Sequence, residues 1–295
     1  MTLPIFGPTD DPGPNFMATL ARTKKKDAGY YWWNSSMDSA VGERNGIAAN
    51  LANWTGDTLA DRMRHGTTII ALRYKDGVIV AGDRRATEGH LIAYRNMEKV
   101  IRVDQYSAMA IAGAAGPAME MARLFSTQLE HYEKVEGVSL SIEGKANQLS
   151  QMVREHLALA MRGMVVIPIF AGYDIQAGSG RIYTFDVTGG HYIEEEHAAE
   201  GSGGRNARSV LKQSWHTDIS RDAALALAIE ALVEAADEDI ATGPPDILRG
   251  IYPIVATITS AGYQAINDDE TASMVHSLYD RLQARGENSD WRRSR

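Results

Sequence analysis

Hairpins and pairs of helices alternate along this chain from residue 67 onward, and this order limits the folds open to it. Two β-rich runs, 67–74 and 77–83, are joined by "KDG", a combination typical of a β-hairpin. Residues 97–103 and 106–113 predict a second hairpin. Hairpins join antiparallel strands, whereas parallel strands need a long crossover, so a parallel βαβ sheet is disfavoured.

The later elements repeat this alternation. We expect helices at 117–134 and 141–162, strands at 164–174, 180–188 and 191–201, helices at 203–216 and 220–240, strands at 251–259 and 262–267, and a helix at 270–285. Strand blocks that alternate with helix pairs predict an α+β fold. Its expected form is a four-layer αββα sandwich, in which two antiparallel sheets lie face to face and helices cover both outer sides.

Residues 1–66 differ from the rest of the chain. They hold four of the nine prolines within the first fourteen positions, and three of the five tryptophans. Their helical patterning is brief, so we expect a segment that cannot bury much of its own surface. The domain boundary is therefore predicted at 66/67, with one domain over 67–295 and a frayed polar tail at 286–295.

Composition excludes several classes of function. The net charge of −8 argues against nucleic acid as the main ligand, and the absence of cysteine removes thiol nucleophiles and cysteine-ligated metals. No apolar run has the length of a membrane span, and the N-terminus lacks the features of a secretory signal. A cytoplasmic protein without membrane contacts is expected.

Few nucleophiles remain for a hydrolase. Eight histidines leave a serine–histidine–carboxylate triad open, but no "GxSxG" elbow is present, and no metal-binding spacing such as "HExxH" occurs. We therefore expect neither a metal nor a cofactor. A threonine at a chain terminus carries its own base, because a free α-amine has a pKa of about 7.7–8.0.

Gly66 and Thr67 stand where the composition changes. If the peptide bond between them were cut, Thr67 would gain a free amine. A glycine at 66 would let the backbone turn tightly, so that the Thr67 hydroxyl could reach the Gly66 carbonyl. Residues 1–66 would then be a pro-segment that blocks the amine until cleavage.

The stretch "HGTTIIALRYKDGVIVAGDRRAT…NMEKVIRVDQYSAMAIAGAAG" resembles the catalytic β subunit of the 20S proteasome, an N-terminal-nucleophile hydrolase. The long leading segment and "DEDIATGPPDILRGIYPIV" are most similar to the actinobacterial branch. The resemblance covers Thr67 to about residue 267, and its motifs are specific jointly rather than singly. It implies a precursor that becomes a threonine peptidase by autocatalytic cleavage after Gly66.

The resemblance assigns roles in the first half of the domain. Thr67 matches the nucleophile, Asp83 the family carboxylate, and Lys99 the buried lysine that Asp83 would hold. Arg85 matches a structural arginine beside the site, and Gly113 the glycine whose N–H would serve as oxyanion donor. By residue pattern alone, Lys99 would be a solvent-facing lysine and Gly113 a turn glycine.

In the second half the match needs small insertions. Ser202 in "EGSGG" matches a serine near the threonine amine, although alone this stretch would be an ordinary loop. Asp239 and Thr242 match an aspartate and a hydroxyl residue that hydrogen-bond the amine and its neighbours.

The substrate pocket would be lined by five uncharged residues, which are Ala86, Met97, Ile111, Ala115 and Met119. An apolar pocket predicts cleavage after large apolar or aromatic residues, in the chymotrypsin-like manner.

The resemblance also implies partners. β subunits would form a seven-membered ring, two such rings would stack, and α-subunit rings would close the ends. Unfolded substrates, recruited by a small protein tag, would arrive through the α gate from an ATPase ring. This chain has no ATPase motif, so any energy use would belong to that partner.

Three alternatives remain open. One is the simpler bacterial threonine peptidase of two stacked rings without α subunits, but its chains are shorter and mature close to the initiator methionine. The second is a catalytically silent ring scaffold, which the presence of Thr67, Asp83 and Lys99 disfavours. The third is an N-terminal-nucleophile amidase for a small substrate, which would be expected to yield two retained chains.

Overall fold

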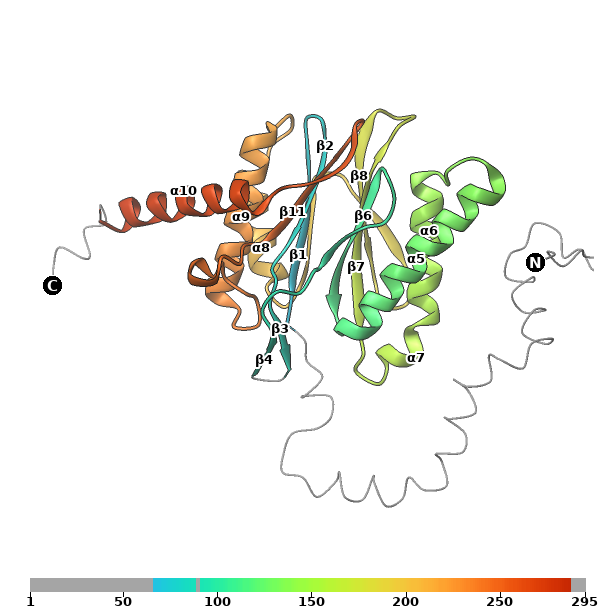
Figure 1. Cartoon of the computed structure of the whole chain (residues 1–295), viewed down its shortest axis with the longest axis horizontal. Helices are drawn as coiled ribbons and strands as arrows, with labels where there is room; N and C mark the ends of the chain where they lie inside the picture. Colours follow the sequence, from blue (N-terminus) through green and yellow to red (C-terminus); the bar gives the residue numbers. More distant parts are fainter. Residues whose placement is uncertain (1–65, 89–90, 288–295) are drawn as a thin grey trace, which may run out of the picture. The chain divides into compact units, whose positions relative to one another are not determined.

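The computed structural model describes residues 66–88 and 91–287. They form the expected α+β sandwich, in which all paired strands are antiparallel (Figure 1). The predicted pro-segment, apart from Gly66, lies outside these residues, and so does the predicted tail beyond Glu287. In the described part of the chain, no helix is long and apolar enough to cross a membrane.

The first sheet has the strand order β10-β1-β2-β11-β12. Its members are β1 (Thr68–Tyr74), β2 (Gly77–Gly82), β10 (His197–Gly201), β11 (Ile254–Thr259) and β12 (Gly262–Ala265). The predicted first hairpin is present, with Tyr74 paired to Gly77. Glycine is needed at 77 because a Cβ there would lie 2.1 Å from the Ile258 carbonyl oxygen.

The second sheet has the strand order β5-β6-β7-β8-β9. Its members are β5 (Val100–Arg102), β6 (Ser107–Gly113), β7 (Val166–Asp174), β8 (Ser179–Phe185) and β9 (His191–Glu194). A separate two-stranded sheet of β3 (Ala86–Glu88) and β4 (Leu91–Tyr94) was not predicted. Its second strand is exposed throughout, so it carries no alternating pattern of buried residues.

Helices cover the outer face of each sheet (Figure 1). The first sheet is covered by α8 (Gly204–Ser214) and α9 (Arg221–Glu238), with α10 (Asp268–Glu287) beside them. The second sheet is covered by α5 (Ala115–Glu136) and α6 (Ile142–Glu155), and the short α7 (Leu157–Ala160) follows α6. A short 3₁₀ helix, Ile247–Arg249, precedes β11. The predicted helix 141–162 is thus divided at His156.

Three apolar clusters match the three interfaces between the four layers. Along β1, Ile69 and Ala71 belong to the cluster between the sheets, whereas Ile70 and Leu72 belong to the cluster under α8 and α9. Side chains alternate between the two faces of a strand, so a strand covered on both sides is apolar throughout. This explains why β1 and β2 are almost continuously buried.

The prediction of one strand over 191–201 is wrong. The chain forms two strands there, and they belong to different sheets, because β9 pairs with β8 and β10 pairs with β1. Glu195 and Glu196 lie between them, where the chain passes from one sheet to the other. This change of sheet brings Gly201 opposite Thr68, beside the start of β1.

Candidate active site

Thr67 lies immediately before β1 and is 5% exposed. Its carbonyl oxygen accepts a hydrogen bond from the Ser202 N–H at 2.9 Å, and its own N–H donates to Ser202 Oγ at 3.2 Å. A Cβ at Gly201 would lie 1.9 Å from the Thr67 carbonyl oxygen, and Gly201 has a φ of 98°. The turn after β10 therefore needs glycine to approach Thr67 this closely.

Gly66 is held in a tight position. Its N–H donates to Thr87 Oγ1 at 2.9 Å, and a Cβ at this residue would lie 1.7 Å from the Ala241 Cβ. Any side chain at position 66 would thus collide with the loop after α9. This close approach gives a steric reason for glycine at position 66. The sequence alone indicates only the conformational freedom of glycine.

Asp83 and Lys99 form a fully buried ion pair, with 2.7 Å between Asp83 Oδ1 and Lys99 Nζ. The prediction from residue pattern alone, a solvent-facing Lys99, is therefore wrong, because Lys99 is only 1% exposed. Lys99 Nζ also donates to the Arg85 carbonyl oxygen at 2.5 Å. Burial lowers the pKa of Lys99, although the Asp83 carboxylate opposes this by stabilising the ammonium.

The Asp83 carboxylate joins three backbone segments. Oδ1 accepts the Thr68 N–H at 2.8 Å, and Oδ2 accepts the N–H groups of Arg85 and Gly243, each at 2.9 Å. Together with Lys99, these donors satisfy a charge that would otherwise be costly to bury. The residue after Thr67 is thus bound to the same carboxylate as the buried lysine.

A second carboxylate is connected to the Thr67 nitrogen through Ser202. Asp239 Oδ2 accepts hydrogen bonds from Ser202 Oγ at 2.5 Å and from Thr242 Oγ1 at 2.6 Å. Ser202 follows β10 and Asp239 follows α9, so two loops distant in sequence meet here. Ser202 in turn accepts the Thr67 N–H, which places Thr67 one hydroxyl away from this carboxylate.

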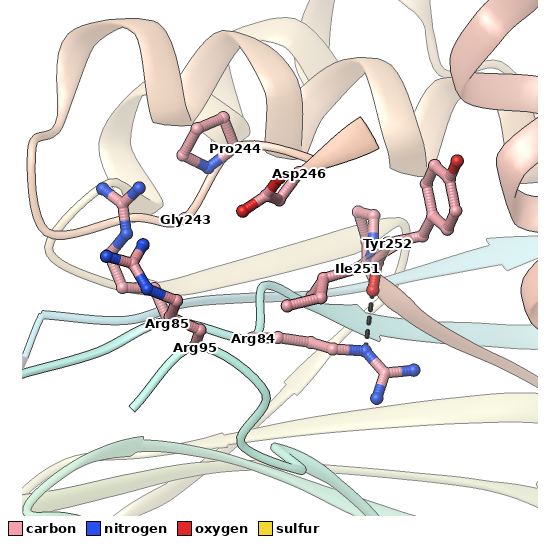
Figure 2. A pocket seen from close by; sticks show the side chains of 9 residues that line it. Arg84, Arg85, Arg95, Gly243, Pro244, Asp246, Ile251 and Tyr252 are labelled. Atoms are coloured by element: carbon pink, nitrogen blue, oxygen red, sulfur yellow. Dashed lines mark hydrogen bonds between the residues drawn. The ribbon is translucent and has the colours of Figure 1, made fainter. Parts of the chain in front are cut away.

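Arg85 fixes the loop that carries Asp239 and Thr242. Its guanidinium donates to the carbonyl oxygens of Ile240 at 3.0 Å and Thr242 at 3.3 Å. Figure 2 shows Arg85 beside Gly243 in a pocket that Arg84 also lines. Arg84 is used structurally, because its Nε donates to the Tyr252 carbonyl oxygen at 2.7 Å.

Gly113 lies in the second sheet, at the end of β6. Its φ of 109° and the 2.0 Å between a Cβ built there and the Val165 carbonyl oxygen both require glycine. Across residues 66–88 and 91–287, the hydrogen bonds of the structure do not link Gly113 directly to Thr67.

The five predicted pocket residues come from four parts of the fold. Ala86 begins β3, Met97 precedes β5, and Ile111 lies in β6. Met97 packs against the apolar cluster that contains Ile111. Ala115 begins α5, and Met119 lies on the same helix with 39% of its surface exposed. The set thus ranges from the buried Ile111 to the exposed Met119.

Sequence reasoning missed three residues that complete these contacts. The Thr68 hydroxyl lies 2.6 Å from Thr242 Oγ1, Gly203 donates its N–H to Thr68 Oγ1 at 3.1 Å, and Thr87 accepts the Gly66 N–H. The one local sign of any of them is the doublet "TT" at 67–68, which places Thr68 directly after the candidate nucleophile. No cluster of histidine and acidic side chains in the described residues could hold a metal ion.

The arrangement has the parts of a site for a nucleophilic hydroxyl. A buried ammonium and two hydrogen-bonded carboxylates lie around the start of β1, and the backbone nitrogen of Thr67 contacts the Ser202–Asp239 pair. Lysine charge can stabilise a developing oxyanion, and hydroxyl–carboxylate pairs can orient a neighbouring base.

Comparison with known proteins gives consistent matches. Residues 63–247 match the protein family described as "Proteasome subunit". A protein named "Proteasome subunit beta" from Acidimicrobium ferrooxidans is 49% identical over 287 residues, which cover 97% of this chain and 96% of that protein. Another of the same name, from Streptomyces griseus, is 51% identical over 217 residues, covering 74% of this chain and 77% of that protein.

Proposed function

The chain belongs to the proteasome subunit family, and on that premise we propose that it is a catalytic β subunit, a threonine-type endopeptidase whose nucleophile is Thr67. Residues 1–66 would be a pro-segment, removed when the chain cleaves its own bond between Gly66 and Thr67. Residues 67–295 would be the mature subunit. The proposal needs no metal or cofactor.

One observation carries this proposal, namely the set of contacts at the Thr67 nitrogen. In the uncut chain, this N–H donates to Ser202 Oγ, and Ser202 donates its own proton to Asp239. Cleavage would turn the nitrogen into an α-amine with an ordinary pKa of about 7.7–8.0. Because Ser202 already gives its proton to Asp239, it can only accept from the amine, and the amine lone pair stays available as a base.

The proposed reaction proceeds through an acyl-enzyme. The Thr67 amine takes the proton of the Thr67 hydroxyl as Oγ1 bonds to the scissile carbonyl carbon. The Gly113 N–H binds the oxyanion, and the Lys99 ammonium stabilises the negative charge that develops on Oγ1. The tetrahedral intermediate then collapses, and the leaving amine takes the proton held by the Thr67 amine. Water next attacks the ester, the same amine accepts its proton, and Thr67 is regenerated.

Self-processing would use the same hydroxyl: Thr67 Oγ1 bonds to the Gly66 carbonyl carbon, the Gly66–Thr67 C–N bond breaks, and the hydroxyl proton passes to the departing Thr67 nitrogen. Water then hydrolyses the resulting ester, which releases residues 1–66 and restores the Thr67 hydroxyl. The close approach of Gly66 to Ala241 supports this role, because Ala241 belongs to the same loop as Asp239 and Thr242. Asp83 supports it further, since it holds the Thr68 N–H on the other side of Thr67.

The pocket of Ala86, Met97, Ile111, Ala115 and Met119 is the proposed basis of a chymotrypsin-like preference. None of these residues is charged, so an ionised substrate side chain would lose its hydration without gaining a partner. Met97 and Met119 are flexible, which would widen the range of apolar side chains accepted.

Membership of the family also suggests the assembly partners of the chain and its location in the cell. We propose that the chain assembles with other β subunits in a seven-membered ring, that α-subunit rings cap the stacked β rings, and that a regulatory ATPase ring delivers unfolded substrates tagged by a small protein modifier. A cytoplasmic location follows from this proposal.

Replacement of Thr67 tests the proposed function. In assembled particles, Thr67→Ala should leave the precursor uncut and abolish peptide hydrolysis, because the reacting oxygen is absent. Thr67→Ser keeps a hydroxyl and an amine, so it should still mature and cleave, which makes it the matched control. A Thr67→Ala chain that matures alone, or hydrolyses peptides at the rate of the unmodified protein, would contradict the assignment.

A further inference from the structure

Thr68 follows the proposed nucleophile, Thr67, and the proposed function assigns it no part. Thr68 is fully buried, at 0% exposure, and its hydroxyl contacts two other segments of the chain. Thr68 Oγ1 accepts the Gly203 N–H at 3.1 Å and lies 2.6 Å from Thr242 Oγ1. These partners are 135 and 174 residues away in sequence. One hydroxyl thus joins the start of β1 to both loops of the candidate site.

The chemistry of the partners fixes the direction of these hydrogen bonds. Thr242 has a single hydroxyl proton, and it donates that proton to Asp239 Oδ2. In the contact between the two threonines, Thr68 must therefore be the donor and Thr242 the acceptor. A chain of donors runs from Gly203 N–H through Thr68 and Thr242 to Asp239, which also receives the Ser202 proton.

The Thr68 hydroxyl lies in a closely packed, buried place. A Cβ built on Gly203 would lie 2.5 Å from Thr68 Oγ1 and 2.7 Å from Thr242 Oγ1, so the three groups are in close contact. If the hydroxyl were removed, the Gly203 N–H would lose its acceptor and Thr242 Oγ1 would lose its donor, both in a buried place.

We propose that Thr68 is a positioning residue for the nucleophile beside it. It acts through Gly203, the neighbour of Ser202, and through Thr242, which shares Asp239 with Ser202. By holding both loops against the start of β1, it keeps Ser202 Oγ where it accepts from the Thr67 nitrogen. This inference rests on the proposed function, since it assumes that Thr67 is the nucleophile.

The test compares full-length chains in assembled particles. Thr68→Val keeps the branched shape and removes the hydroxyl, Thr68→Ala removes it with a smaller side chain, and Thr68→Ser keeps it. The measurements are the rate of precursor conversion, and kcat and KM for a fluorogenic peptide. Thr257→Val is the control, because Thr257 is buried in β11 of the same sheet and is not part of this hydrogen-bond chain.

We expect both hydroxyl-free variants to convert more slowly and to lose about 10- to 100-fold in kcat, with KM changed less than about twofold. Thr68→Ser should restore kcat, and Thr257→Val should leave it unchanged. If Thr68→Val and Thr68→Ala keep normal kcat, or if KM rises while kcat is kept, the inference is wrong.

The Thr67→Ala chain, measured in parallel, separates this inference from the proposed function. If Thr67→Ala stays uncut and Thr68→Val behaves normally, only the role of Thr68 fails. If Thr67→Ala matures by itself, the proposed nucleophile is wrong, and the role of Thr68 fails with it.

Discussion

Two lysine–carboxylate pairs in this molecule have the same length and different surroundings. Lys99 and Asp83 are 2.7 Å apart, with side chains 1% and 0% exposed. Lys145 and Asp104 are also 2.7 Å apart, with side chains 7% and 20% exposed. The first pair lies beside Thr67, whereas the second joins α6 to the turn between β5 and β6.

The contacts around each carboxylate separate the two pairs. Asp83 accepts backbone N–H groups from the start of β1 and from the loop after α9, so it joins segments distant in sequence. Asp104 accepts the N–H of Tyr106, two residues along the same turn. A buried ion pair alone therefore does not mark an active site. In our account, the marker is a carboxylate that binds the backbone N–H next to the proposed nucleophile and the loop after α9 at the same time.

The largest effect that this comparison predicts comes from removing Lys99. Lys99→Ala should lower precursor processing and peptide kcat by about 10²–10³, because loss of one preorganised electrostatic contact typically costs that much. The measurement is single-turnover processing together with steady-state hydrolysis by assembled particles.

Lys145→Ala is the matched control for Lys99→Ala. It breaks a pair that touches none of the site residues, so kcat per assembled particle should stay within about twofold. The melting temperature should fall, because removing one partner leaves the other charge partly buried and unpaired. Equal losses of kcat in the two variants would contradict the proposed role of Lys99, because the two lysines would then be equally important for activity.

A smaller effect should appear in the pH dependence of kcat/KM for peptide hydrolysis. Burial lowers the pKa of Lys99, so its ammonium is lost at a lower pH than that of an ordinary lysine, whose pKa is about 10.4. As the pH rises through this lowered pKa, activity that depends on the charge should fall, by about tenfold per pH unit at its steepest. Peptide kcat/KM should therefore show an alkaline limb below pH 10.4. A limb at the same pH in Lys99→Ala would assign it to another group.

The smallest predicted effect concerns substrate choice, which neither lysine should set. Peptides that end in Tyr or Leu should exceed matched Arg or Glu peptides in kcat/KM by about tenfold, because the proposed pocket is uncharged. The ranking should be the same in Lys145→Ala particles. Preference for the Arg or Glu peptide would mean that the pocket residues are misplaced, or that a neighbouring subunit contributes a charge.

Sequence patterns predicted the layers of this fold because each depends on local periodicity. The hairpin at "KDG" and the helices of 117–134 and 220–240 have clear signals, and all are present. The division of 191–201 between two sheets could not be predicted, because both halves are short strands of mixed apolar and polar residues and the change of sheet depends on their neighbours. The β3–β4 hairpin was missed because its exposed residues show no pattern of burial.

The candidate site was predictable only in part. The resemblance supplied Thr67, Asp83 and Lys99, and the structure brings the last two together and joins them to Thr68. The contact of Thr68 with Thr242 spans 174 residues, and no local pattern indicates such a pairing. The burial of Lys99 likewise depends on tertiary structure, because its own segment has the pattern of an amphipathic strand on which Lys99 would face solvent.

The central claim is that Thr67 becomes the first residue of the working subunit. Intact-mass measurement and N-terminal sequencing of assembled, active particles test it most directly. Our account predicts one major chain that begins at Thr67 and has lost residues 1–66. An active particle whose chain keeps residues 1–66, or begins at any residue other than Thr67, would contradict the account.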